Sequence, residues 1–139
     1  MRAINEIIIH CADTPNGKEF HAKDIDAWHR ERGWQMIGYH WVIAIDGTVE
    51  AGRSPEMVGS HAEGHNARSL GICLIGKDKF TPAQWNSLKA LVDGLVKEFN
   101  CPVIGHYEVA KNGKTCPNFC VRSWVADGYI PDDKNTFWE

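Results

Sequence analysis

Three residues of types that bind metal ions follow predicted strands or lie in a loop. His10 closes a run of three isoleucines, His106 follows the apolar pair Val103-Ile104, and Cys116 lies ten positions after His106 in a polar loop. Two imidazoles and one thiolate suit Zn²⁺, and three protein ligands leave a fourth position open for water. An open position is typical of a hydrolytic zinc site, because zinc makes hydroxide available near neutral pH.

The spacing alone leaves other interpretations open. The chain has neither HExxH nor paired CxxC, and a lone histidine is more often a surface group or a packed core residue than a ligand. Cys116 and Cys120 have the spacing of one helix face, so they could share a metal, or be a solvent-side thiol and a buried helix thiol. Five unevenly spaced cysteines do not indicate a disulfide framework, and Cys11 and Cys73 are expected in the core.

The elements that must position these residues are short strands mixed with helices. Strands are expected at 7–9, 39–45, 70–75 and 102–105, with a turn at Asp46-Gly47 into a further strand. Helices are expected at 23–33, from 81 onward for about four turns, and at 117–126. The pattern predicts an α/β (α+β) fold, with a single mixed central β-sheet flanked by helices, and the length predicts one domain over residues 1–139.

The helix expected after residue 80 has the clearest sequence features. Thr81 is a good N-cap, Pro82 suits the first helical position, and Gln84 completes a capping box. One apolar stripe follows, made of Trp85, Leu88, Leu91, Leu95 and Phe99.

Composition and charge exclude several classes of protein. The net charge of −3 does not indicate nonspecific binding of nucleic acid, and no stretch approaches the ~18 apolar residues that a membrane span requires. The start MRAINEIIIH lacks the features of a signal peptide. We therefore expect no membrane insertion, and a cytoplasmic protein unless something else releases it.

Five stretches together carry a family resemblance: IIIHCADTP, WHRERGWQMIGYHWVIAIDGTVEAGR, VGSHAEGHNARSLGICLIG, FTPAQWNSLKALV and HYEVAKNGKTCP. They resemble the N-acetylmuramoyl-L-alanine amidases of the type 2 amidase and peptidoglycan recognition protein superfamily. The resemblance covers roughly residues 6–126. Within the superfamily the likeness is greatest to the phage amidases known as T-odd lysozymes.

The resemblance implies one Zn²⁺ per chain, with His10, His106 and Cys116 as metal ligands, Tyr39 of the GYH motif as a catalytic residue, and a catalytic lysine two residues before the ligand cysteine. That lysine is Lys114. The loop from 106 to 116 is longer here, through Asn112-Gly113, so Lys111 is an alternative, and Lys114 is preferred because it keeps its distance to the cysteine.

Five further residues are candidates for substrate binding: Trp34, Arg53, His61, Asn66 and Arg68. Each has an ordinary alternative. His61 and His65 could be solvated loop residues, and Arg53 could pair with a surface acid. His40 is expected to be a packing residue that points away from Tyr39.

The function implied by the resemblance is that of a phage endolysin, a single catalytic domain without a separate cell-wall-binding domain. Such an enzyme hydrolyses the amide between N-acetylmuramic acid and L-alanine in peptidoglycan. It acts as a monomer, waits in the host cytoplasm until a holin releases it, and then degrades the wall in the periplasm. The alternatives are a non-hydrolytic peptidoglycan-binding module and a phage regulatory protein that binds RNA polymerase. Retention of Cys116 and Lys114 favours the hydrolase, and a shorter segment before the first strand disfavours the polymerase binder.

Overall fold

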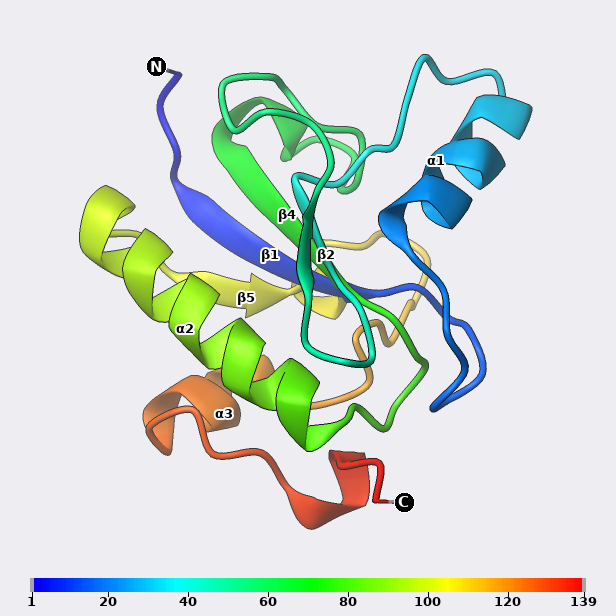
Figure 1. Ribbon diagram of the computed structural model, residues 1–139. Coiled ribbons are helices and arrows are strands. Elements are labelled where there is room, and N and C mark those ends of the chain that lie inside the picture. Colours follow the sequence, from blue (N-terminus) through cyan, green and yellow to red (C-terminus); the bar gives the residue numbers. More distant parts are fainter. Residues whose placement is uncertain (1, 139) are drawn as a thin grey trace.

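A five-stranded mixed sheet forms the centre of the computed structural model, which describes residues 2–138 (Figure 1). The strands are β1 (Glu6–Cys11), β2 (Trp41–Ile43), β3 (Val49–Ala51), β4 (Ser69–Leu74) and β5 (Val103–Gly105), in the order β3-β2-β4-β1-β5. β1 is parallel to β4 and β5, β2 is parallel to β4, and β3 is antiparallel to β2. The predicted mixed sheet is confirmed.

Helices cover both faces of this sheet (Figure 1). α2 (Pro82–Phe99) and α3 (Val121–Ala126) pack on one face, and α1 (Ala22–Glu31) packs on the other. Side chains alternate between the two faces along each strand. On β1, Ile7 and Ile9 therefore join the core beneath α2, while His10 points to the side of α1.

The start of α2 follows the sequence prediction. The Thr81 hydroxyl accepts a hydrogen bond from the Gln84 N–H at 3.1 Å, and the Gln84 carboxamide accepts one from the Thr81 N–H at 2.9 Å. The same carboxamide donates to the carbonyls of Ile43 and Ile75, at 3.0 and 2.8 Å. One buried side chain therefore caps the helix and fixes it to residues at the ends of β2 and β4.

Two boundaries differ from the sequence prediction for local backbone reasons. The strand expected at 39–45 is regular only from Trp41 to Ile43. The last helix begins at Val121 rather than Pro117, because Asn118 has a φ of 67°, a left-handed conformation that a right-handed helix excludes. Cys120 is thereby left exposed as the N-cap of α3, so the prediction of a buried helix thiol was wrong.

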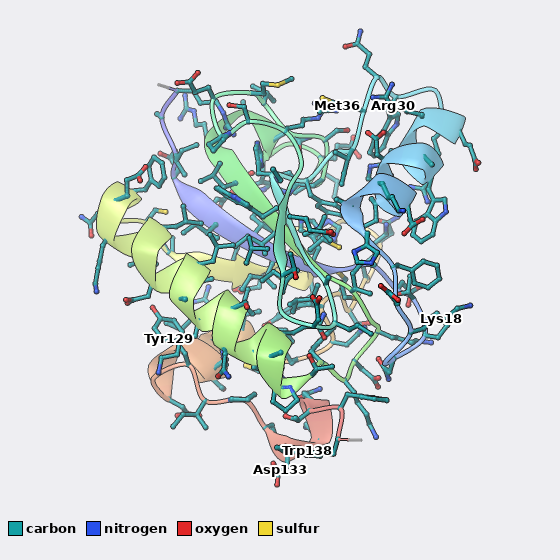
Figure 2. All side chains as sticks on the ribbon, in the orientation of Figure 1. Lys18, Arg30, Met36, Tyr129, Asp133 and Trp138 are labelled. Atoms are coloured by element: carbon teal, nitrogen blue, oxygen red, sulfur yellow. The ribbon has the colours of Figure 1, made fainter. Side chains whose placement is uncertain are left out.

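The C-terminal segment packs beside the start of α2. The Trp85 indole donates to the carbonyl of Asn135 at 3.2 Å, and the backbone of Phe80 pairs with Asn135 and Phe137 on either side. Tyr129, labelled beside α2 and α3 in Figure 2, places its ring 4.9 Å from that of Trp124. Within residues 2–138, none of the helices combines the length and apolar character that crossing a bilayer requires.

Candidate active site

Three potential metal ligands converge at the carboxyl ends of β1 and β5. His10 lies in β1, His106 follows β5 directly, and Cys116 comes from the loop after it. One ligand atom from each lies within 4.8 Å of the others. Open α/β sheets place their binding sites at the carboxyl ends of strands, where neighbouring loops meet. The topology therefore assembles ligands that are far apart in the sequence.

The donor set fits a zinc ion. Zinc takes nitrogen at about 2.0 Å and thiolate sulfur at about 2.3 Å, so the donor atoms of a tetrahedral site lie roughly 3.5 Å apart. The observed spread requires only small side-chain adjustments to reach this arrangement. The backbone N–H of Cys11 also donates to the sulfur of Cys116 at 3.0 Å, a contact that stabilises the negative charge of a thiolate.

The loop that carries Cys116 is held by its own backbone. The Tyr107 N–H donates to the carbonyl of Cys116 at 2.9 Å, and the Asn118 N–H donates to the carbonyl of Thr115 at 2.8 Å. The Asn118 carboxamide also donates to the carbonyl of Lys77 at 2.7 Å. The protein's own hydrogen bonds therefore hold the Cys116 loop in place.

The electrostatic environment keeps both candidate imidazoles in the form that binds metal. Burial lowers the pKa of His10 well below its ordinary value, and the neighbouring His61, His106 and Lys114 lower it further. Burial and then the charge of Lys114 lower the pKa of His106. Because a metal binds neutral imidazole, both side chains are ready to coordinate at neutral pH.

Tyr39 lies beside this cluster as a protonated phenol. Its ring centroid is 5.0 Å from that of His10, and its backbone carbonyl accepts the N–H of Arg53 at 2.9 Å. Burial raises the pKa of Tyr39 well above 10, and the thiols of Cys73, Cys116 and Cys11 raise it further. A phenol in this state donates a hydrogen bond rather than acting as a base.

The cluster opens into a cavity of about 700 Å³. Lys111 and Lys114 both lie on its wall, and the charge of Lys114 lowers the pKa of both candidate imidazoles. Six of the residues predicted from the sequence line this cavity besides the three ligands: Trp34, Tyr39, His61, Asn66, Lys111 and Lys114.

Comparison with known proteins gives the same family as the sequence resemblance. The sequence profile of the N-acetylmuramoyl-L-alanine amidase family matches residues 1–119. This chain belongs to that family. The endolysin of Escherichia phage T7 is 43% identical over 127 residues, which cover 85% of this chain and 83% of the relative. The endolysin of Enterobacteria phage T3 is 43% identical over 133 residues, which cover 88% of this chain and 87% of the relative.

Solved structures of other proteins have the same fold. The N-acetylmuramoyl-L-alanine amidase LysC from Clostridium intestinale URNW superposes with a TM-score of 0.82 at 35% identity, over 94% of this chain and 88% of that one. Drosophila PGRP-LB superposes with a TM-score of 0.75 at 25% identity, over 96% of this chain and 87% of that one. The predicted membership of the amidase and peptidoglycan recognition protein superfamily is confirmed.

Two predicted substrate-binding residues of this amidase-family chain lie outside the cavity wall. The Arg53 guanidinium donates to the carbonyls of Ile37 and Val58, both at 2.8 Å, and so supports the backbone around Tyr39. Arg68 lines a separate hollow of about 300 Å³. His65 lines the same hollow and hydrogen-bonds the carboxyl group of Glu6.

His40 has a structural position, as expected, although its direction differs from the prediction. It precedes the regular part of β2, so the strand alternation does not apply, and its ring packs 5.8 Å from that of His61. Its Nε2 hydrogen-bonds the Met57 carbonyl at 2.8 Å, and its Nδ1 accepts the Gly71 N–H at 3.0 Å. Both nitrogens are therefore engaged in holding backbone.

Two residues that line the cavity were not predicted as site residues from the sequence. They are His29, in α1, and Arg32, at its C-terminal end. His29 is buried, accepts the Gly38 N–H on its Nδ1 at 3.0 Å, and packs 4.4 Å from the ring of Trp34. Its position four residues after Ile25, on the same helix face, was a usable indication of burial. Its partner at Gly38 could not be found from local pattern.

Proposed function

We propose that this chain is a zinc-dependent N-acetylmuramoyl-L-alanine amidase of the endolysin type, which hydrolyses the amide between N-acetylmuramic acid and L-alanine in bacterial peptidoglycan. One observation carries the proposal. His10, His106 and Cys116 converge at a cavity that Tyr39 and Lys114 also line, in a chain that belongs to the amidase family.

The metal site and the wall of the cavity have separate tasks. When bound by His10, His106 and Cys116, zinc would supply Lewis-acid polarisation of the scissile carbonyl and activation of a water. The Cys11 N–H keeps the ligand sulfur in place, and burial keeps the two imidazoles neutral. The chain would thus hold the metal with groups that need only small side-chain adjustments.

Lys114 would stabilise the negative charge that develops on the carbonyl oxygen during attack. Its ammonium lies on the cavity wall and acts electrostatically on the histidines at the base of the site. A cation placed where charge develops lowers the barrier more than one that binds the ground state. Lys111 lies on the same wall, and Lys114 is preferred because its charge lowers the pKa values of both histidines.

Tyr39 would orient the attacking water or the tetrahedral intermediate by donating a hydrogen bond. Its raised pKa rules out a useful fraction of phenolate at neutral pH. Its ring position against His10 and His29 keeps the phenol at the base of the cavity.

The substrate we propose is a glycan strand with its stem peptide. The cavity of about 700 Å³ is large enough for a sugar and the first residues of a peptide, and most of its lining residues are polar. Trp34 offers an aromatic surface for a sugar, and Asn66 and Arg32 offer polar contacts. Arg53 and Arg68 do not line this cavity, so we do not propose them as substrate contacts.

The phage relatives support an endolysin role in the cell. We propose that residues 1–139 act as one catalytic domain, as a monomer that stays in the host cytoplasm until a holin opens the membrane and then reaches the wall in the periplasm. The similarity to the endolysins of phages T7 and T3 motivates this proposal. A binding-only module is the alternative that the following assay separates from it.

Turbidity of purified peptidoglycan measures the proposed activity directly. We expect clearing by the zinc-loaded protein, no clearing after treatment with a chelator, and recovery when zinc is added back. Mass spectrometry should find a new amino terminus on L-alanine. Full activity of metal-free protein would refute the zinc mechanism, and tight binding to peptidoglycan without cleavage would favour the binding module.

A further inference from the structure

His61 contacts the candidate metal ligand His10 directly. Its Nδ1 lies 2.8 Å from the Nε2 of His10, which is hydrogen-bonding distance. A neutral imidazole has one N–H and one lone pair. With Nε2 of His10 committed to His61, Nδ1 is the nitrogen of His10 that remains for a metal.

A metal on Nδ1 of His10 would set the direction of this hydrogen bond, and a second contact can accommodate that direction. Nε2 of His61 lies 3.2 Å from the hydroxyl of Ser69, a fully buried residue of β4. If His10 binds metal through Nδ1, its proton must be on Nε2 and must be donated to Nδ1 of His61. The proton of His61 is then on Nε2 and is donated to Ser69. In this arrangement the N–H groups of both imidazoles have an acceptor.

The fold reserves the space that the His61 ring occupies. A Cβ on Gly71 would lie 2.7 Å from Cγ and Nδ1 of His61, and a Cβ on Gly59 would lie 2.7 Å from Cδ2. The Asn66 side chain accepts the N–H groups of His61 and Ala62, both at 2.9 Å, which fixes the loop that carries the ring. The two glycines leave room for the imidazole, and the hydrogen bonds of Asn66 hold the loop that carries it.

We propose that His61 is a positioning residue that selects the tautomer and ring orientation of His10 for zinc. This inference rests on the proposed zinc function. Metal-binding histidines commonly donate their second N–H to an acceptor that orients the ring and raises the basicity of the ligand. Here the acceptor is another imidazole, that of His61, whose own N–H is donated to the hydroxyl of Ser69 in β4.

A matched pair of variants tests the proposal. Asn places an amide oxygen close to where Nδ1 of His61 lies, and Leu has nearly the shape of Asn without any acceptor. We expect His61→Leu to weaken zinc binding by about 10–100-fold, the range typical of such outer partners, and His61→Asn to keep most of the affinity. Zinc affinity is measured by competition with a chromophoric chelator, and thermal unfolding of the metal-free proteins shows whether both variants fold equally well.

The outcomes separate this inference from the proposed function. Equal zinc affinity of wild type and His61→Leu would overturn the positioning role and leave the zinc function intact. Failure of wild type itself to bind zinc would overturn both. A His61→Asn variant as weak as His61→Leu would also contradict the role of the acceptor.

A measurement on the wild-type protein needs no variant. Long-range proton–nitrogen NMR spectra report which ring nitrogen of each histidine carries the proton. In the zinc-loaded protein we expect the proton on Nε2 of both His10 and His61. A proton on Nδ1 of His61 would reverse the hydrogen bond and overturn the proposal.

Discussion

The two faces of the sheet are made by the same strands and differ in their polar content. Toward α2, β1 and β4 present only apolar side chains, and Trp85, Leu88 and Phe119 close over them. Toward α1, the same strands present His10, Ser69 and Gly71 beside the apolar Ile8 and Cys73. The first three form hydrogen bonds or leave room for a neighbouring ring. One residue of shift along a strand therefore separates a packed core from a network of polar contacts.

The difference shows which kind of constraint each face carries. Apolar packing is nondirectional and tolerates exchange of similar side chains at modest cost. The polar face depends on particular donors and acceptors, and each loss leaves a partner unsatisfied. Substitutions on the α2 face should therefore change stability, and substitutions on the α1 face should change metal binding and activity.

The largest effect is expected from the sulfur ligand. Cys116→Ser should lower activity by about 1,000-fold or more, because the metal contributes several kcal/mol to transition-state stabilisation. The matched control is Cys120→Ser, which alters the exposed thiol at the start of α3. Rates of peptidoglycan clearing should be normal for this control. An active Cys116→Ser protein would show that the sulfur is not a ligand.

The next largest effect is expected from the lysine on the cavity wall. Lys114→Ala should lower kcat by about 100–1,000-fold, the usual effect of removing one donor to a developing oxyanion, with zinc affinity unchanged. Lys111→Ala, three positions earlier in the same exposed loop, is the control and should keep most of its turnover. A reversal of these two results would assign the catalytic role to Lys111.

On the α2 face, Leu88→Ala should lower the free energy of unfolding by about 2–5 kcal/mol, because the buried side chain leaves a cavity. Denaturant titration measures this loss. At temperatures where the variant remains folded, we expect zinc affinity close to that of wild type. A large loss of zinc affinity in the folded variant would mean that the two faces are coupled.

The smallest effect is a pH dependence that comes from the α1 face. Burial lowers the pKa of His61 from 6.5 to about 3, so the unfolded chain binds more protons than the folded chain between these values. Stability of the metal-free protein should thus fall with falling pH, by about 2 kcal/mol from this residue between pH 7 and pH 5.

Burial also lowers the pKa of His29 and His40, which act in the same direction. His21 acts in the opposite direction, because Glu19 and Glu50 raise its pKa. Chemical denaturation at several pH values checks the net slope. His61→Leu should have a shallower slope than wild type, and an unchanged slope would contradict the assignment.

Local pattern predicted the apolar face well and the polar face poorly. The Thr81 and Gln84 capping box and the apolar stripe of α2 are encoded within a few residues, so the sequence shows them directly. The hydrogen bond between His10 and His61 joins residues 51 positions apart, and no spacing rule predicts such a pair. The family resemblance named His10, His106 and Cys116 as candidate ligands, whereas the position of His61 in a polar loop suggested a substrate contact or a solvated residue.

The assignments of Arg53 and Cys120 show a second limit. A charged side chain near a predicted site suggests a substrate contact, yet Arg53 is engaged by backbone carbonyls that only the folded chain brings close. The exposure of Cys120 depends on the left-handed backbone at Asn118, which residue types alone do not determine.

The hydrogen bond from the Cys11 N–H to the sulfur of Cys116 has a consequence for how the protein is stored and prepared. The protein's own hydrogen bond ties the loop to β1. Unlike small zinc-dependent domains, the chain should therefore fold without a bound metal ion. Protein produced in zinc-poor medium should be folded but inactive. Adding the ion should restore activity as fast as the ion binds, without a refolding phase.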